Sequence, residues 1–255
     1  MNSLLMVAPF GLLVGLILGA LGGGGAILTV PILVYLLGQS PSAATAGSLV
    51  IVSLISVVGV ASHHSRGNVR FKDGLLFGLF GVVGSLLGSR LSIAVPAVAL
   101  MSSFGVLLVV VGTLMARRAL KGASATDTGD RRSPVAIVLA ATAVGLLTGF
   151  FGVGGGFAVV PALVLVLGFP MPAAVGTSLV VIVVNSLVAL AARVTGGVEI
   201  EWPLILVFSF FGALGSLWGG RVAARVDPRH LTAAFSALLF VVAAYVLAMN
   251  LPQLL

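Results

Sequence analysis

Eight apolar segments, separated by short polar stretches, dominate the pattern of hydrophobic and polar positions. They cover residues 4–37, 42–62, 74–93, 96–116, 134–168, 173–192, 203–222 and 231–250. Most are about 20 residues long, the length of helix that crosses the hydrocarbon core of a bilayer. Segments 4–37 and 134–168 are about 35 residues long, so each would form a straight helix of about 50 Å against a core of about 30 Å. The pattern predicts membrane helices, two of which are too long for one simple crossing.

The two over-long segments each contain a cluster of glycines. The clusters are Gly22, Gly23, Gly24 and Gly25 in the first, and Gly152, Gly154, Gly155 and Gly156 in the second. Because glycine costs a helix interior about 1 kcal/mol relative to alanine, each cluster predicts a broken helix or a re-entrant hairpin. A break inside the membrane frees backbone N–H groups and a helix dipole, and these favour an anion. Close packing of helices through small residues is the alternative explanation.

The glycine clusters belong to an internal repeat. Residues 14–31, VGLILGALGGGGAILTVP, match residues 144–161, VGLLTGFFGVGGGFAVVP, at 9 of 18 positions, and GSLLGSR at 84–90 resembles GSLWGGR at 215–221. We expect one membrane domain made of a first repeat (1–116), a polar linker (117–133) and a second repeat (134–255). Duplicated halves are typical of secondary transporters, although a duplication can also persist only because it packs well.

Composition supports an all-α, polytopic membrane protein. The chain is 60% hydrophobic and 7% charged, far below the roughly 25% charged residues of soluble domains. The apolar runs lack the period-two alternation of a transmembrane barrel. The net charge of +7 does not indicate nucleic acid as a partner, because the basic residues lie between apolar segments, where they set topology. Since cysteine is absent from the sequence, disulfides and thiolate metal sites are excluded.

The distribution of Lys and Arg predicts the topology. If each long segment turns back at its glycines, one side of the membrane holds Arg66, Arg70, Lys72, Arg117, Arg118, Lys121, Arg131, Arg132, Arg221, Arg225 and Arg229, and the other holds Arg90 and Arg193. The positive-inside rule prefers this split to the one with eight crossings. We therefore expect three spanning helices plus a glycine-rich hairpin in each half, 8–10 hydrophobic helices in all. An odd number of crossings makes the repeats inverted, with the linker cytoplasmic and both termini extracytoplasmic.

The candidate binding residues are small and uncharged. They are the eight glycines above together with Thr45, Ser48, Thr177, Ser178 and Asn185. Hydroxyl, amide and backbone N–H groups suit an anion that must bind and then leave, and no Asp or Glu lies inside a span to repel it. Hydroxyls that bond their own helix are the alternative.

Charged and titratable residues lie at the ends of the spans. Arg90 and Arg221 end equivalent spans, either as gates for an anion or as snorkelling anchors. His63 and His64 end another, either as coupling groups or as wet interfacial side chains. The sequence contains no nucleophile elbow, Walker loop or metal-binding spacing, so we expect neither an enzyme nor a cofactor.

These motifs resemble one known family. GALGGGGAILTVPIL followed by AATAGSLVIV, and GFFGVGGGFAVVPALV followed by AAVGTSLVVI, are similar to the sulfite exporter TauE/SafE family, also called toluene sulfonate uptake permeases. The first half departs slightly, with Ala46-Gly47-Ser48 where the second has Gly176-Thr177-Ser178.

The resemblance implies transport of sulfite, sulfonates or sulfoacetate across the bacterial inner membrane, by alternating access around the glycine breaks. The expected partners are such an anion, the lipid bilayer and a possible second copy of the chain. A membrane scaffold that transports nothing, or a carrier of another small anion, remains the alternative.

Overall fold

The computed structural model describes residues 2–92, 95–121, 134–151, 156–194 and 201–250, and within these ranges the secondary structure is helical, without strands. The ten α-helices and three short 3₁₀ or π elements are α1 (Asn2–Leu21), η1 (Gly23–Gly25), α2 (Ala26–Pro31), η2 (Ile32–Leu36), α3 (Pro41–His64), α4 (Phe71–Ser92), α5 (Ala97–Lys121), α6 (Pro134–Phe151), α7 (Gly156–Pro161), η3 (Ala162–Val166), α8 (Met171–Val194), α9 (Trp202–Arg225) and α10 (Pro228–Asn250).

Seven of these helices are long and apolar enough to cross a membrane, namely α3, α4, α5, α6, α8, α9 and α10. Shorter apolar helices cover Val7–Leu21, Gly23–Leu36 and Gly156–Val166. The prediction of an all-α polytopic membrane protein is confirmed, and the shorter helices lie on both sides of the first predicted break and directly after the second.

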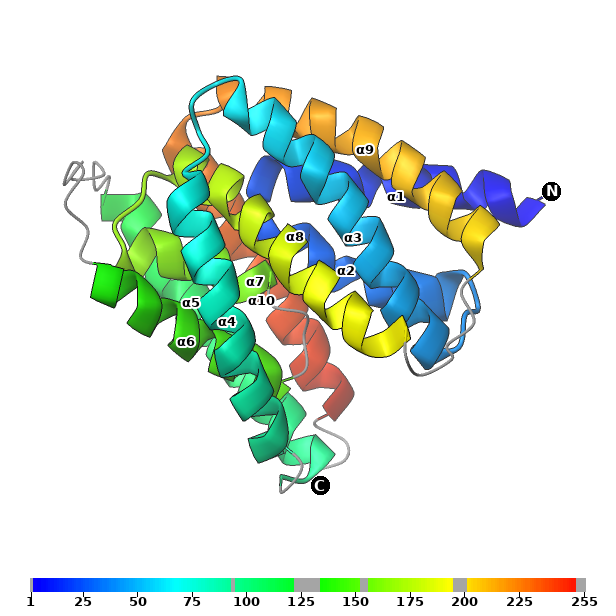
Figure 1. The fold of residues 1–255 in the computed structure, drawn as a ribbon, viewed down its shortest axis with the longest axis horizontal. Coiled ribbons are helices and arrows are strands. Elements are labelled where there is room, and N and C mark those ends of the chain that lie inside the picture. The colour runs from blue at the N-terminus through cyan, green and yellow to red at the C-terminus, as the bar shows by residue number, and fades with distance from the viewer. Residues whose placement is uncertain (1, 93–94, 122–133, 152–155, 195–200, 251–255) are drawn as a thin grey trace.

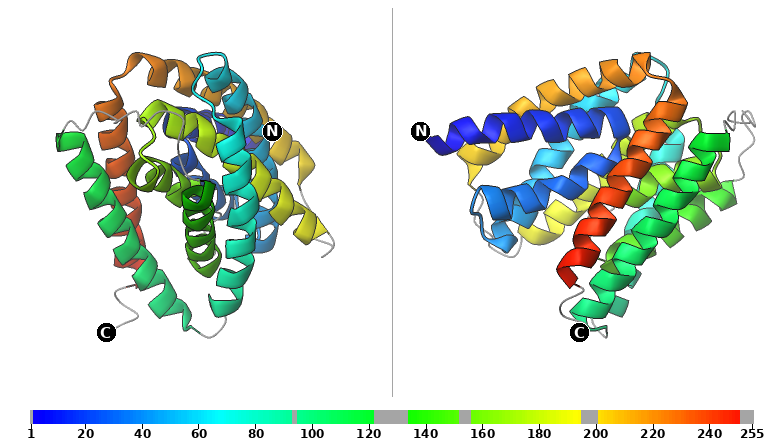
Figure 2. Two further views of the ribbon diagram at one scale, coloured as in Figure 1. Left: turned by 60° about the vertical axis from the view of Figure 1, so that its left-hand side comes forward. Right: turned by 180° about the vertical axis from the view of Figure 1, so that it is seen from behind.

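The first over-long segment breaks at its glycines. Helix α1 ends at Leu21, and Gly22 has φ 72°, a left-handed conformation that residues with a Cβ rarely adopt. The chain then forms η1, α2 and η2 and runs back beside α1, so that η2 ends near the N-terminus (Figures 1 and 2). Pro31 ends α2, and the helix continues as a π-helix from Ile32. This segment is therefore a helical hairpin broken at its glycines.

The second over-long segment is interrupted at the equivalent place. Helix α6 ends at Phe151 and α7 starts at Gly156. Helix α7 ends at Pro161, and a π-helix follows, as it does after Pro31. Gly152, Gly154 and Gly155 lie outside the described residues, so the structure describes only Gly156 of this cluster.

The first helix of each half packs along the third long helix of the other half. Helix α1 lies along α9, and α6 lies along α4 (Figure 1). A Cβ at Gly15 would overlap the backbone of Gly212, and a Cβ at Gly145 would overlap the backbone of Gly81. Such close approach requires glycine at the contact, so the small-residue packing that we considered for the breaks also occurs between these helices.

The repeated motifs at 84–90 and 215–221 belong to the same two contacts. Gly84 and Gly88 of α4 face the backbone of Thr142 and Leu146 in α6. In the other half, Gly215 and Gly219 of α9 face the backbone of Leu12 and Leu16 in α1, and these are the equivalent positions in the repeat. These four glycines therefore serve helix packing.

Helices α3 and α8 cross the centre of the molecule side by side and in opposite directions (Figure 1). The end of α3 meets the start of α8, since a Cβ at Gly176 would lie 3.0 Å from the Cβ of His63. Helices α5 and α10 are also antiparallel neighbours, because Gly105 faces Leu247 and Gly112 faces Phe240. The molecule is thus built from two antiparallel helix pairs, α3 with α8 and α5 with α10, and two parallel pairs, α1 with α9 and α4 with α6.

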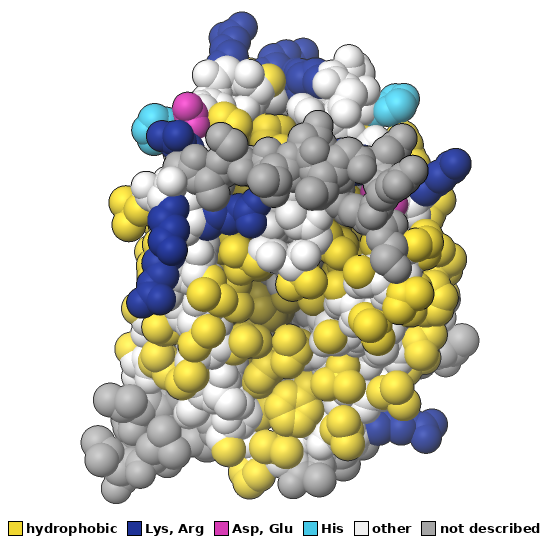
Figure 3. All heavy atoms as spheres, turned by 90° about the vertical axis from the view of Figure 1, so that its left-hand side faces the viewer, with side chains coloured by type: hydrophobic (Ala, Val, Ile, Leu, Met, Phe, Trp, Pro, Cys, Tyr) yellow, Lys and Arg dark blue, Asp and Glu magenta, His cyan; other side chains and the backbone are white. Residues whose placement is uncertain are grey.

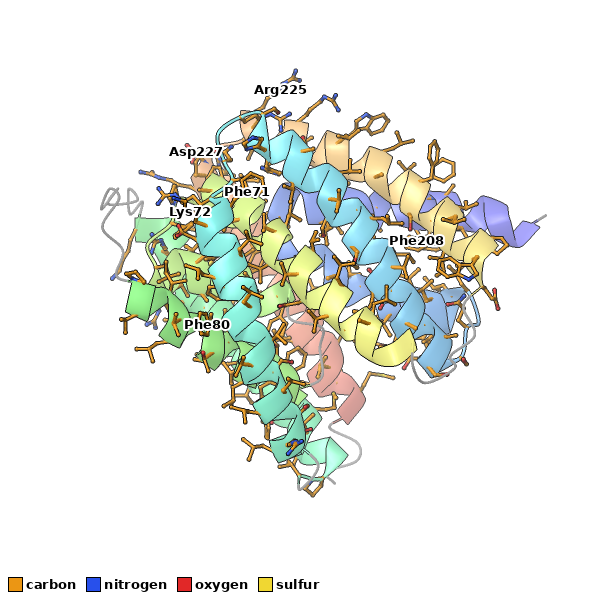
Figure 4. The ribbon with its side chains drawn as sticks, in the orientation of Figure 1. Phe71, Lys72, Phe80, Phe208, Arg225 and Asp227 are labelled. Carbon is orange, nitrogen blue, oxygen red and sulfur yellow. The ribbon has the colours of Figure 1, made fainter. Side chains whose placement is uncertain are left out.

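Basic side chains gather at one end of the molecule. Figure 3 shows most of the visible Lys and Arg side chains above a broad belt of apolar side chains. Figure 4 places Lys72, at the start of α4, at the same end as Arg225 and Asp227, which lie near the α9–α10 connection. An apolar belt with charged residues at its edges is the surface expected of a protein surrounded by lipid.

Candidate binding site at the helix breaks

The helices that follow the two predicted breaks meet in the interior. A Cβ at Gly23 would overlap the carbonyl oxygen of Gly156, and a Cβ at Gly156 would lie 2.9 Å from the carbonyl oxygen of Gly23 and 3.4 Å from the Cβ of Ala26. Gly23 and Gly156 are both buried. They also begin the apolar helices Gly23–Leu36 and Gly156–Val166. The N-terminal ends of two apolar helices therefore meet at one point, and the first N–H groups of a helix have no acceptor within that helix.

Each of the other glycines in the first cluster faces a different neighbour. A Cβ at Gly22 would overlap the hydroxyl of Ser178 and lie 3.0 Å from Cγ2 of Val160. Gly24 faces Cδ2 of Leu238, the end of a flexible side chain, at 2.6 Å. A Cβ at Gly25 would lie 2.7 Å from the backbone nitrogen of Leu18 in α1. Gly22, Gly23 and Gly24 thus face the second half of the chain, whereas Gly25 faces α1.

The two candidate serine hydroxyls are engaged within their own helices. The Ser178 hydroxyl donates to the carbonyl of Val175 at 2.7 Å, and the Ser48 hydroxyl donates to the carbonyl of Thr45 at 2.8 Å. The alternative considered from sequence, that these hydroxyls bond their own helix, is therefore what this structure contains. Because a hydroxyl can rotate, Ser178 can still offer its hydrogen to a ligand that replaces Val175 as acceptor.

Thr177 holds the start of α8 to a neighbouring connection. Its hydroxyl oxygen accepts a hydrogen bond from the backbone N–H of Arg70 at 3.1 Å. The guanidinium carbon of Arg70 lies 4.9 Å from the centre of the Phe169 ring, just before α8. Thr177 therefore fixes the helix that carries Ser178, and its contact is to the chain rather than to the break.

Asn185 does not lie at the break. It is about two turns beyond Ser178, and a Cβ at Gly81 would be 3.9 Å from both atoms of its amide group and 3.8 Å from the carbonyl oxygen of Ala141. Its Oδ1 is buried and has no hydrogen-bond partner among the described residues. The equivalent residue in the first half is Ile55, which faces Gly212 in the same way. Asn185 thus belongs to the contact of α8 with α4 and α6.

Arg90 and Arg221 lie near the ends of α4 and α9, and both are exposed. Neither side chain lines the buried contact between the breaks. Their positions fit snorkelling anchors, whose charged ends stay in water.

Sequence reasoning missed part of the buried polar surroundings of the first break. His63 is 2% exposed and lies against α1, with its Nε2 2.8 Å from the carbonyl oxygen of Gly19. The hydroxyls of Ser56 and Ser216 are buried without a hydrogen-bond partner in the described part of the chain. Gly59, one turn before His63, faces the Ser216 hydroxyl at 2.9 Å. No local sequence signal connects these groups, because Gly19 and His63 are 44 residues apart.

Acidic groups are absent from the surroundings of the break that the structure describes. The described acidic residues lie at helix ends: Asp73 in the first turn of α4, Glu201 before α9 and Asp227 before α10. No group of three or more His, Asp or Glu side chains that would hold a metal ion occurs within the described ranges. The positive ends of the two helices therefore face no carboxylate in this part of the structure.

Comparisons with known proteins agree on one family. The family model for the sulfite exporter TauE/SafE matches residues 7–246. A probable membrane transporter protein of Xylella fastidiosa is 32% identical over 253 residues, covering 96% of this chain and 95% of its own length. The probable membrane transporter protein YunE of Bacillus subtilis is 27% identical over 252 residues, covering 90% of each chain. No solved structure matches the chain. The chain is a membrane protein that belongs to the sulfite exporter TauE/SafE family.

Proposed function

We propose that this protein is a secondary transporter of small sulfur-containing anions, such as sulfite, sulfonates or sulfoacetate. The anion binds where the two helix breaks meet, and access to it alternates between the two sides of the membrane. The family name supports the substrate class, and the relatives are named as probable membrane transporters. A carrier binds and releases its substrate unchanged, so no catalytic residues are required.

The observation that carries the proposal is the contact between Gly23 and Gly156. Each helix N-terminus carries about half a positive charge, so two such ends repel one another when they meet. An anion about 4 Å from both ends would gain about 2 kcal/mol from each at an effective dielectric constant of about 20. The same anion would remove the repulsion between the ends. The meeting point is therefore more stable with an anion than without one.

The surroundings leave this attraction available to a ligand. A buried carboxylate at the meeting point would neutralise the helix ends, and none is present among the described residues. Hydrogen bonds to a charged group contribute about 1.5–3 kcal/mol each. After the desolvation of the anion is subtracted, a few such bonds leave micromolar to millimolar affinity, which suits a carrier that must release its substrate.

The helix arrangement supports two inverted repeats related by a two-fold axis. The pairing of α1 with α9 is repeated by α6 with α4, and α3 and α8 meet in opposite directions. A two-fold axis that exchanges antiparallel membrane helices lies in the membrane plane, which is the symmetry of inverted-repeat transporters. In this proposal the 117–133 linker is cytoplasmic, both termini are extracytoplasmic, and the membrane is the bacterial inner membrane.

Flux into proteoliposomes tests the function. Labelled sulfite and labelled methanesulfonate should enter vesicles containing the purified protein, saturably and faster than they enter protein-free vesicles. Each should compete with the other. A folded protein that moves neither anion would contradict the proposal and favour a scaffold, whereas uptake of bicarbonate or chloride in preference to both would identify a carrier of another anion.

A further inference from the structure

An imidazole is buried beside the first break. His63, the last residue but one of α3, is 2% exposed, and its Nε2 lies 2.8 Å from the carbonyl oxygen of Gly19. Gly19 is about one turn before Gly22 on α1, so the ring lies next to the helix end that leads into the break. The other ring nitrogen, Nδ1, is buried and has no hydrogen-bond partner among the described residues. A buried polar atom of this kind costs free energy unless a ligand or a proton uses it.

The contact with Gly19 determines which nitrogen carries hydrogen. A carbonyl oxygen can only accept, so Nε2 must be the donor, and Nδ1 of the neutral ring presents a lone pair. A lone pair repels an anion. Once Nδ1 takes a proton, the same atom becomes a donor on a positively charged ring, which attracts an anion. The state of Nδ1 therefore determines whether His63 opposes or favours an anion at the neighbouring break.

Among the described residues, the groups packed against His63 provide no counter-ion for a protonated ring. The facing residues of α1, α8 and α9 are Gly19, Gly176 and Gly220, which carry no charge. The charged group that acts on the imidazole is Arg66, in the connection that follows α3, and this group is also positive. The other basic residues on these elements and the adjoining connection are His64, Arg221 and Arg225, which are exposed, Arg70, whose guanidinium lies over Phe169, and Arg193 near the end of α8. Because a buried charge needs a partner, a proton on Nδ1 is stable only together with an anion.

We propose that His63 is the proton-binding site of this transporter and that one proton binds Nδ1 with each anion. This inference rests on the proposed function and adds its coupling ion. The proton comes from the solution on the side from which the anion binds, stays on Nδ1 while the anion is bound, and leaves with it on the other side. The position equivalent to His63 in the second repeat is Arg193, whose type of side chain keeps its proton throughout.

Two variants of His63 and one matched control distinguish the effect of losing a titratable side chain from the effect of disturbing the structure. In His63→Gln, the side-chain amide retains an N–H that can donate to Gly19, but it does not titrate. His63→Asn is a second variant that does not titrate, in case the first fails to fold. His64→Gln is the control, because His64 is the exposed neighbour whose ring meets Phe71 at 5.0 Å between centroids. Gel filtration in detergent confirms that each variant is folded.

The decisive measurement is the KM for methanesulfonate as a function of pH in proteoliposomes, together with proton entry reported by a trapped pH-sensitive dye. Methanesulfonate remains a monoanion across the range, so only the protein titrates. In the wild type and in His64→Gln, the KM should rise about tenfold per pH unit at pH values where the His63 imidazole is mostly deprotonated. One proton should enter with each anion. In His63→Gln and His63→Asn, the KM should be raised and independent of pH, and no protons should enter.

Several outcomes would overturn the inference. A wild-type KM that does not change with pH, or uptake without proton entry, would exclude proton coupling while leaving the proposed anion transport intact. A normal pH dependence in His63→Gln or His63→Asn would exclude His63 as the site. If the wild type carries neither sulfite nor methanesulfonate, the proposed function is wrong and the inference fails with it. If neither variant folds, the pH dependence and the proton-to-anion ratio of the wild type still decide whether a proton is coupled.

Discussion

Gly23→Ala tests whether the contact between the two breaks is the transport site. The added Cβ would overlap the carbonyl oxygen of Gly156, which is backbone and cannot rotate away. The two helix ends must therefore separate. Overpacking of this kind costs about 1–3 kcal/mol of stability. If separation removes one or two hydrogen bonds to a bound anion, each worth about 1.5–3 kcal/mol, affinity falls by at least about tenfold, and by at least about a hundredfold if two are lost.

Gly24→Ala is the matched control. It places the same methyl group one residue later, where it meets Cδ2 of Leu238 at 2.6 Å, and that side chain can move. We expect Gly24→Ala to retain most of its sulfite uptake and Gly23→Ala to lose nearly all of it, while both insert and elute as folded protein. Initial rates in proteoliposomes and thermal unfolding in detergent would be measured on the same preparations. Equal transport by the two variants would refute the reasoning, because it would show that the breaks need not touch for anions to cross.

Three further predictions concern other parts of the molecule. Asn185→Ile, which copies Ile55 of the other half, removes an unpaired buried oxygen and should raise the melting temperature by a few degrees. It should change the KM for sulfite by less than about threefold, and a tenfold loss of affinity would show that Asn185 belongs to the binding site. Gly15→Leu should prevent α1 from packing on α9, so that membrane-inserted protein aggregates on extraction, whereas Leu13→Ala on an exposed position should extract normally. Single cysteines introduced into this cysteine-free chain should react with an impermeant maleimide from outside the cell at the N-terminus and only after lysis in the 117–133 linker; the reverse pattern would reject the inverted topology.

The break itself was predictable from the sequence because the excess length of the segment and the position of its glycines point to the same place. Segment 4–37 is too long for a single crossing, and its glycines lie at the middle, so the position of Gly22 follows from helix geometry and propensity alone. The fold class follows in the same way from hydrophobic length, with no knowledge of tertiary contacts.

Tertiary contacts determine which neighbour each side chain faces, and the sequence alone could not predict them. Asn185 and Ser178 have similar polarity and lie on one helix, but Asn185 faces Gly81 of α4 while Ser178 faces Gly22. Which face of a helix meets which neighbour depends on pairings between distant segments. For the same reason His63 looked like one of two interfacial histidines, and only its contact with Gly19 distinguishes it from His64.

The exchange of helices between the two halves has a consequence for how the chain is made. During synthesis, α1 enters the membrane with its packing face, Gly11, Gly15 and Gly19, uncovered, and its partner α9 is completed only about 200 residues later. The glycine face of helix α4 likewise stays uncovered until α6 has been synthesised. Neither half can bury its own glycine faces, so the first half must persist as an open intermediate until the second arrives. Assembly is therefore late and mutual, and a chain cut in the 117–133 linker should regain its structure only when both pieces are produced together in the same membrane.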